Sequence, residues 1–232
     1  MRITIHQPEH LPWLGLLAKV GAADVWVVLD SVAFRKNYFQ NRNRVLTDGQ
    51  PAWLTVPVTA PHGTLIRDVR VARSPEWQRR YRGRLAHSLP EAARQGRLQP
   101  LLESLERCRA GDRLADLNLE IADWLLTEFK VGTPRVRSSE LGIGGHKSEL
   151  IRNLCLALGA DEYLAGPSGR DYLDHADFVA HGITVRFFDF LHPTYDQGGG
   201  VFVPNLSSVD AVARLPQADL PPLLTGYRLS VA

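Results

Sequence analysis

Residues 2–30, RITIHQPEHLPWLGLLAKVGAADVWVVLD, contain the pattern that decides the fold of this chain. Residues 2–5 alternate as a strand does, and Pro12 suits the first turn of a helix that ends at Gly21. Residues 24–30 are a continuous apolar run closed by a carboxylate, which is typical of a strand buried on both faces. A strand, a helix and a second strand in so short a stretch form a βαβ unit. We therefore predict an α/β fold with a mainly parallel, Rossmann-like three-layer sheet.

The rest of the chain predicts more strands around a helical insertion. Further strands are expected at residues 51–58, 134–137, 162–166 and 183–190. Residues 147–160 have the pattern of an amphipathic helix, and the Gly- and Pro-rich tail after the last strand is expected to wrap the surface. We expect a single domain over residues 1–232, with a mostly helical insertion at about 74–130, where apolar side chains recur at helical spacing.

The composition narrows the class of protein. The chain has 232 residues, of which 44% are hydrophobic and 22% charged, as in ordinary folded soluble proteins. It has no apolar run long enough for a transmembrane helix, and its first residues lack the features of a signal peptide, so we expect a cytoplasmic protein. Cys108 and Cys155 lie on apolar helical faces, which predicts buried free thiols.

Three polar loops each follow the end of a predicted strand. They are HQPEH at residues 6–10, LDSVAFRKNYFQNRNR at 29–44 and AGPSGRDY at 165–172. In open parallel sheets, ligands collect at the carboxyl ends of the strands. The three loops therefore predict one shared site.

The first loop carries two histidines, His6 and His10, four residues apart. This spacing suits a metal on a helix, but Pro8 interrupts a helix and no third ligand is evident, so we expect no metal site. A structural reading has His6 hydrogen-bonded at the strand end. The other reading is polar catalysis, or phosphate binding beside a helix N-terminus.

The second loop carries four basic side chains and no acid within RKNYFQNRNR, residues 35–44. Aromatic residues lie between them, so the segment fits an anion clamp, a nucleic-acid platform or a solvated loop. With a formal net charge of only +2, a small anionic ligand is favoured over nucleic acid.

In the third loop, Gly166 and Gly169 would let the backbone approach a ligand, although a tight turn that caps the next helix explains them equally well. Lys147 and Ser148 open a helix and are suited to phosphate, but the glycine spacing before them is not that of a P-loop. Ser168 lacks the nucleophile elbow of serine hydrolases, so covalent catalysis is not expected.

Four stretches together resemble the WbqC-like protein family. In order, they are HQPEHLPWLG, ADVWVVLDSVAFRKNYFQNRNR, KSELIRNLCLALGADEYLAGPSGRDYL, and FFDFLHPTYDQ followed by FVPNLSSVD. The resemblance spans nearly the whole chain, except for about residues 60–135, which carry little of it. The positions that are hallmarks of that family are occupied here by His6, Gln7, Trp13, Gly15, Asp30, Arg42, Arg44, Lys147, Gly166, Ser168, Gly169, Arg170, Asp171, Tyr172 and Asn205.

The resemblance implies a bacterial enzyme of O-antigen sugar or specialised-metabolite biosynthesis that transfers an acyl or aminoacyl group to an amine. Together with the three loops, it makes His6 the residue expected to act as general base or to stabilise the developing charge, with Asp30 and Asp171 orienting groups or taking up a proton. Arg42, Arg44 and Arg170 would hold the anionic part of the donor. The full set of side chains expected to bind ligands is Gln7, His10, Trp13, Arg35, Lys36, Arg42, Arg44, Lys147, Gly166, Ser168, Gly169, Arg170, Tyr172 and Asn205.

The donor and the partners stay open at this point. The donor is a thioester of coenzyme A or of a carrier protein, or a nucleotide with Mg²⁺. The other expected partner is a small anionic or amino-sugar-like substrate, with no membrane and no nucleic acid.

Two alternative functions also stay open. The strand, His-containing loop and helix are similar to those of nucleotidylyltransferases, although HQPEH is one residue longer than their H-x-G-H signature and lacks its glycine. One alternative is therefore nucleotidylyl transfer. The other is a non-catalytic binder of an anionic sugar or carrier.

Overall fold

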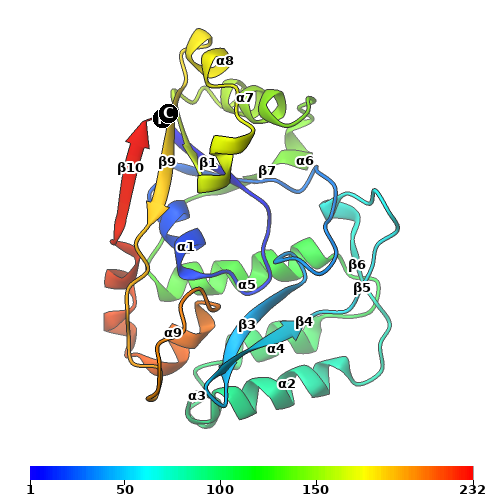
Figure 1. Cartoon of the computed structure of the whole chain (residues 1–232). Helices are drawn as coiled ribbons and strands as arrows, with labels where there is room; N and C mark the ends of the chain where they lie inside the picture. The colour runs from blue at the N-terminus through cyan, green and yellow to red at the C-terminus, as the bar shows by residue number, and fades with distance from the viewer. Residues whose placement is uncertain (232) are drawn as a thin grey trace.

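The computed structural model describes residues 1–231, without the side chains of residues 93 and 94, so residue 232 of the predicted domain lies outside the described residues. A six-stranded sheet forms the centre of the fold, in the order β10-β9-β8-β1-β2-β7 (Figure 1). Five strands are parallel: β1 (Arg2–His6), β2 (Val25–Val28), β7 (Arg135–Arg137), β8 (Glu162–Ala165) and β9 (Thr184–Phe190). The predicted α/β class with a mainly parallel sheet is confirmed, whereas its Rossmann-like three-layer character stays a prediction.

The N-terminal βαβ unit forms where the sequence predicts it. The strands β1 and β2 pair in parallel, and α1 (Leu14–Gly21) connects them. Successive residues of β2 face opposite sides of the sheet, as the pleat of a strand requires. Trp26 packs in the core that holds α1 and α5 (Leu114–Glu128), and Val27 packs in the core beneath α7 (Ser148–Ala157). Apolar packing on both faces explains the continuous apolar run of this strand.

Helices occupy most of residues 77–128. Besides α5 this region contains α2 (Trp77–Ser88), α3 (Pro90–Arg94) and α4 (Gln99–Arg107). Leu101 of α4 and Ile121 of α5 belong to the same core cluster as Trp26 of the sheet. The helical region therefore packs onto the sheet core, below the sheet in the view of Figure 1.

The predicted strand at 51–58 lies outside the main sheet. The strands β3 (Arg42–Thr47) and β4 (Gln50–Thr55) form a separate antiparallel hairpin. Asp48 and Gly49 join the two strands and both have positive φ, of 51° and 74°, as a two-residue hairpin turn requires. The end of the second polar loop is therefore a strand, which moves its arginines onto the hairpin.

The tail is more regular than the sequence predicts. It contains α9 (Val209–Arg214), whose first four residues are buried, and β10 (Tyr227–Val231), which pairs antiparallel with β9. Hydrogen bonding to the edge of the sheet and burial of apolar side chains outweigh the Gly and Pro content. The prediction of a surface-wrapping tail after residue 190 is therefore wrong.

Short elements complete the fold. They are β5 (Val58–Thr59), β6 (Arg70–Val71), α6 (Ser138–Leu141), α8 (His175–Ala180) and the 3₁₀ turns η1 (Ile66–Asp68), η2 (Pro167–Asp171), η3 (Gln217–Asp219) and η4 (Pro221–Leu224). Cys108 and Cys155 are buried and free, as predicted. Within residues 1–231, none of the helices has the length and apolar character needed to span a membrane.

Candidate active site

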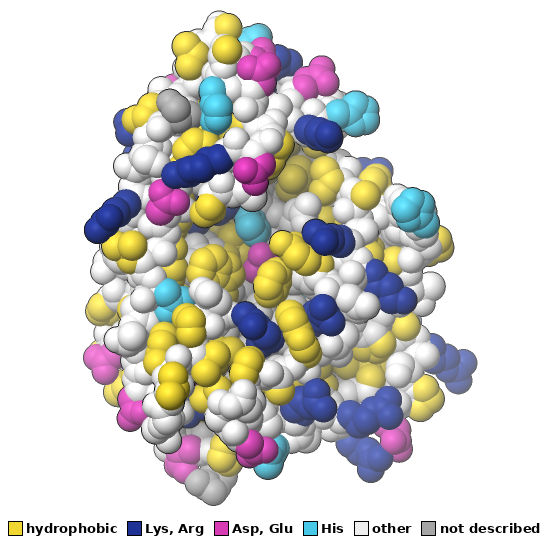
Figure 2. Space-filling model, in the orientation of Figure 1, with side chains coloured by type: hydrophobic (Ala, Val, Ile, Leu, Met, Phe, Trp, Pro, Cys, Tyr) yellow, Lys and Arg dark blue, Asp and Glu magenta, His cyan; other side chains and the backbone are white. Residues whose placement is uncertain are grey.

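A cavity of about 610 Å³ opens where β1 and β2 end, and all three polar loops reach it. The start of α7 completes its wall. Figure 2 shows this face hollowed near its centre, with a histidine and an acidic side chain inside the hollow and basic side chains around it. The polar side chains that line the cavity are His6, Gln7, Glu9, Gln40, Lys147, Ser168 and Tyr172. The apolar part of the wall includes Ile5, Leu29, Val32, Phe39, Leu150 and Ile151.

A chain of three ionisable side chains lies at one wall of this cavity. Nε2 of His6 lies 2.9 Å from Oε1 of Glu9, and Nζ of Lys19 lies 3.0 Å from Nδ1 of His6. His6 is the last residue of β1, Glu9 follows in the loop, and Lys19 comes from α1. The βαβ crossover therefore places the three groups in line. Lys19 is 4% exposed, so it lies behind His6 rather than in the open cavity.

The environment fixes the protonation of this chain. Burial lowers the pKa of Lys19 to about 8, so its amine is mostly an ammonium at neutral pH. Burial, followed by the charge of Lys19, lowers the pKa of His6, so its imidazole is neutral at that pH. An ammonium has no lone pair, so Lys19 donates to Nδ1 of His6. The imidazole proton is then on Nε2 and is donated to the Glu9 carboxylate.

Glu9 carries the unsatisfied hydrogen-bonding position of the site. Its side chain is 9% exposed and lines the cavity, and its Oε2 has no hydrogen-bond partner among the described residues. A buried carboxylate oxygen without a donor is costly, by about 1–3 kcal/mol or more for a charged group. A ligand N–H or O–H group would satisfy it. The arrangement can therefore accept a proton from, or bind, a donor group in the cavity.

Other predicted residues also meet at this cavity. Oε1 of Gln7 accepts a hydrogen bond of 2.5 Å from Nε2 of Gln40, which ties the first loop to the second. Lys147, Ser168 and Tyr172 reach the cavity from α7 and η2. The structure thus brings together His6, Gln7 and these three among the residues predicted from the sequence.

His10, predicted to bind a ligand, lies outside the cavity lining among the described residues. Its side chain is fully buried, with Nε2 lying 2.7 Å from the Tyr81 hydroxyl and Nδ1 lying 3.1 Å from Oδ1 of Asn118. Burial lowers its pKa to about 4. His10 therefore joins the first loop to the helical insertion.

The two aspartates predicted to be catalytic lie outside the cavity. Asp30 is fully buried and accepts hydrogen bonds from Ser138 and from the backbone and hydroxyl of Ser139. It joins the end of β2 to the start of α6. Asp171 is exposed, and in the part of the chain that the structure describes it is absent from the cavity lining.

The predicted arginines also lie outside the cavity lining among the described residues. Arg42 and Arg44 lie on β3 beside Trp53, and Arg35 lies over the ring of Tyr38. Arg170 packs over the Phe187 ring at 4.0 Å and donates to Asp189 and Ser230, which connects η2 to β9 and β10.

The remaining predicted positions lie outside the cavity lining among the described residues. Trp13 packs edge-to-face on Phe190, and its ring occupies the space that a side chain at Gly15 would need. Gly169 is buried, and a Cβ there would lie 2.9 Å from Leu173, so the glycine allows close packing instead of ligand approach. Gly166 faces the Lys19 amine. Lys36 and Asn205 are exposed, and the Asn205 carbonyl accepts a hydrogen bond from Arg44.

Sequence reasoning missed Glu9 and Lys19. Lys19 had a detectable signal, because it is the one charged residue within the apolar helix LGLLAKVG. Glu9 had a weaker signal, as the acid between the two histidines of the first loop. Their contacts with His6 depend on the tertiary fold.

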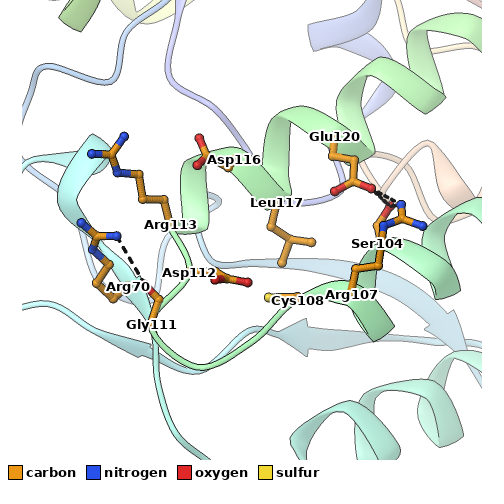
Figure 3. Close-up of a pocket in the computed structure, with 10 residues that line it drawn as sticks. All are labelled: Arg70, Ser104, Arg107, Cys108, Gly111, Asp112, Arg113, Asp116, Leu117 and Glu120. Carbon is orange, nitrogen blue, oxygen red and sulfur yellow. Dashed lines mark hydrogen bonds and ion pairs between the residues drawn. The ribbon is translucent and has the colours of Figure 1, made fainter.

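A second cavity, of about 480 Å³, lies between α4 and α5 (Figure 3). Several of its charged side chains are paired: Arg107 pairs with Glu120, which also accepts from Ser104. Asp116 pairs with Arg137. These ion pairs stabilise the helical region, and the first cavity, with its unpartnered carboxylate oxygen, is the better candidate for chemistry.

Neither a metal centre nor a cysteine nucleophile fits the described chain. Within residues 1–231, no three or more His, Cys, Asp or Glu side chains are grouped closely enough to hold a metal ion. Burial raises the pKa of Cys108 to about 11 and that of Cys155 to about 12, so both stay protonated thiols at neutral pH.

Comparisons with known proteins agree with the resemblance noted in the sequence. The chain is 26% identical over 212 residues to a Mycobacterium tuberculosis protein named "Uncharacterized protein Rv1507c", covering 90% of this chain and 91% of that protein. A search of solved structures gave no significant match. The model of the WbqC-like protein family matches residues 7–220. That match covers nearly the whole chain, and the chain therefore belongs to the WbqC-like protein family.

Proposed function

We propose that this chain is a transferase that joins an activated acyl or aminoacyl group to an amine of a small substrate. The observation that carries the proposal is the chain Lys19–His6–Glu9, which ends on a buried carboxylate oxygen without a partner at the cavity. An amine that becomes an amide must lose a proton, and Glu9 is placed to accept it. We further propose that the reaction takes place in the cytoplasm and serves O-antigen sugar or specialised-metabolite biosynthesis.

Each group in the chain has a distinct part in the proposed mechanism. The amine lies against Glu9 and attacks the carbonyl carbon of the donor. A C–N bond forms, the bond from that carbon to the sulfur or oxygen of the leaving group breaks, and the nitrogen gives its proton to Oε2 of Glu9. The carboxylic acid then returns this proton to the leaving group. His6 orients Glu9 through Nε2–H, and Lys19 keeps that proton on Nε2.

This mechanism moves the role of general base from His6 to Glu9. Both nitrogens of the His6 ring already have partners, since Nε2 lies beside Glu9 and Nδ1 beside Lys19. Oε2 of Glu9, in contrast, has no hydrogen-bond partner in the part of the chain that the structure describes. A base needs a lone pair that no donor occupies, and among the three groups Glu9 has one.

The cavity walls fit a donor with an apolar acyl portion. Leu29, Leu150 and Ile151 line the wall, and Lys147 supplies a positive charge at the mouth. An ammonium at this mouth would stabilise an oxyanion or an anionic leaving group.

Nucleotidylyl transfer has less support. That chemistry would need His10 beside His6 on phosphate oxygens, whereas His10 is buried against Tyr81 and Asn118. A non-catalytic binder could use the Glu9 carboxylate as a hydrogen-bond acceptor, but it would not need a neutral imidazole and an ammonium aligned behind that carboxylate.

The test is a mass-spectrometric assay of the purified chain with acyl and aminoacyl thioesters and a panel of amino sugars. A Glu9→Gln variant keeps the size and the contact with His6 but cannot take up the proton. We expect its turnover to fall by about 10²–10⁴-fold, the usual contribution of general base catalysis. Glu149→Gln, which removes an exposed acid at the start of α7, is the matched control and should retain full turnover.

Two results would contradict the proposal. One is full turnover in the Glu9→Gln variant. The other is saturable binding of an amino sugar to the wild-type chain with no product from any donor, which would identify a binder.

A further inference from the structure

The outer face of the β3–β4 hairpin presents an unusual group of side chains. Arg44 and Trp53 are directly opposite in the hairpin register, and Arg42 is the diagonal neighbour on the same face. The guanidinium carbon of Arg42 lies 4.1 Å from the centroid of the Trp53 ring, and that of Arg44 lies 5.6 Å from it. Trp53 is 36% exposed, so two cations flank an aromatic ring that faces solvent.

These arginines lack anionic partners. Among residues 1–231, no carboxylate lies within ion-pair distance of Arg42, Arg44 or Arg35, whereas most arginines elsewhere on the described surface pair with an acid. The Nε atoms of Arg42 and Arg44 are buried and have no hydrogen-bond partner among the described residues. Arg44 donates a long hydrogen bond of 3.4 Å to the Asn205 carbonyl. Two orphaned guanidinium N–H groups at one place require an acceptor that the chain does not supply.

The group is continuous with the mouth of the cavity. The Trp53 ring lies 6.2 Å from the Phe39 ring, which lies 5.0 Å from the Tyr38 ring, and Phe39 and Tyr38 line the cavity. Tyr38 is 43% exposed and has Arg35 at 4.7 Å over its ring. Along this path three neighbouring rings, Trp53, Phe39 and Tyr38, have guanidinium groups stacked at both ends, Arg42 and Arg44 on Trp53 and Arg35 on Tyr38.

From this geometry we infer that the hairpin face, Arg42–Trp53–Arg44 with Tyr38, binds the phosphates of a nucleotide whose remainder enters the cavity. Paired guanidinium groups suit phosphate because their planar N–H edges give bidentate contacts, and an exposed ring suits a stacked base. A bound phosphate would supply acceptors to the Nε–H groups once each guanidinium rotates in its stacking plane. The statement that this nucleotide is part of a reactant rests on the proposed function. Its binding can be measured without any turnover.

Two kinds of reactant would bring such a nucleotide to the site: a coenzyme A donor, through its nucleotide end, and a nucleotide-linked sugar acceptor. Calorimetric titration of the full chain with adenosine 3′,5′-bisphosphate represents the first, and titration with uridine 5′-diphosphate represents the second. Saturable binding of either one supports the inference and identifies the source. Absence of saturable binding for both overturns it.

Variants locate the binding on the hairpin. The double variant Arg42→Gln/Arg44→Gln should lower the affinity for the nucleotide at least tenfold. Arg42→Lys/Arg44→Lys should lower this affinity less, because the charges are kept although the planar N–H edges are lost. Arg79→Gln/Arg80→Gln, which removes two exposed arginines of α2, should bind as the wild type does. Equal affinity of the first variant and the wild type, with unfolding curves that show both folded, overturns the inference.

Glu9→Gln separates this inference from the proposed function. It should bind the nucleotide with wild-type affinity, because Glu9 lies in the cavity and not on the hairpin. If Glu9→Gln loses turnover and Arg42→Gln/Arg44→Gln binds the nucleotide as the wild type does, the proposed function is retained and the nucleotide site is rejected. If Glu9→Gln keeps full turnover and Arg42→Gln/Arg44→Gln binds the nucleotide more weakly, the nucleotide site is retained and the proposed function is rejected.

Discussion

Nζ of Lys19 lies 3.0 Å from Nδ1 of His6, with the lysine 4% exposed on a helix that is otherwise apolar. A buried ammonium without a paired carboxylate is destabilising by itself, since burial disfavours its charged form. It is placed where it fixes the tautomer of the imidazole that orients Glu9. The site therefore holds an arrangement that costs stability, which is typical of functional sites.

The first prediction concerns the pH dependence of stability that Lys19 causes. Burial lowers its pKa to about 8, from an ordinary value of 10.5 in the unfolded chain. Between these values the unfolded state binds more protons, so stability rises with pH in this window. We expect the free energy of unfolding of the wild type, relative to Lys19→Met, to increase by about 2 kcal/mol between pH 7 and pH 9.5. Urea unfolding at both pH values measures it.

An exposed lysine provides the control for this measurement. Lys130 is exposed after the end of α5, so Lys130→Met should show no such difference between the two pH values. A wild-type minus Lys19→Met difference that is constant with pH would show that the Lys19 amine titrates normally.

The second prediction concerns His10 and acid pH. Its pKa is lowered by burial to about 4, from 6.5. The unfolded chain takes up a proton at this residue below pH 6.5 and the folded chain does not, so stability is lost as the pH falls from 6.5 to 4. The loss attributable to His10 should reach about 3 kcal/mol. It is measured as the change in the difference between the wild type and His10→Gln, which keeps polar contacts but does not titrate.

If the His10→Gln difference does not change across this range, the imidazole is already solvated. The same variant also tests the ligand-binding role expected from the sequence. Turnover at pH 7.5 should be retained, because the side chain contacts Tyr81 and Asn118 and not the cavity.

The sequence was enough to predict that the three polar loops meet, but it predicted the side chains at the cavity only in part. The meeting of the loops follows from a general rule, because the carboxyl ends of parallel strands lie at one edge of the sheet. The sequence did not show that Arg42 lies on a hairpin beside the cavity and not in its wall, because that hairpin depends on the Asp48–Gly49 turn. The contact of His10 with Asn118 joins residues 108 positions apart, which no local pattern shows.

The third prediction separates a structural aspartate from a catalytic one. Asp30 accepts hydrogen bonds from Ser138 and Ser139, and all of them lie at the junction of β2 and α6. Asp30→Ala leaves these donors unsatisfied in a buried site, so we expect a loss of about 3 kcal/mol in the free energy of unfolding. Turnover per folded molecule should be unchanged at a temperature where the variant is folded. Chemical unfolding and a steady-state assay measure the two quantities.

Asp189→Ala is the matched control for this prediction. Asp189 pairs with Arg170 at the exposed sheet edge, and such a pair contributes less than about 1 kcal/mol. A loss of turnover in Asp30→Ala at unchanged stability would restore the catalytic role expected from the sequence.

The fourth prediction concerns strain at the cavity. Lys147 has φ 47° and ψ −120°, a region that glycine occupies easily and other residues rarely do. It also lines the cavity. Lys147→Gly should therefore stabilise the protein by about 1 kcal/mol, since the relief of strain exceeds the added entropy of the unfolded chain. It should lower turnover at the same time, because the ammonium at the cavity mouth is lost.

Lys130 offers a matched comparison, because it too has positive φ, of 57°, but lies after the end of α5 and is not a cavity-lining residue in the described chain. Lys130→Gly should raise the melting temperature in the same direction with no effect on turnover. Both variants are compared by calorimetric melting and by the steady-state assay. Equal turnover in the two variants would mean that the strain at Lys147 serves the turn before α7 and not the chemistry of the cavity.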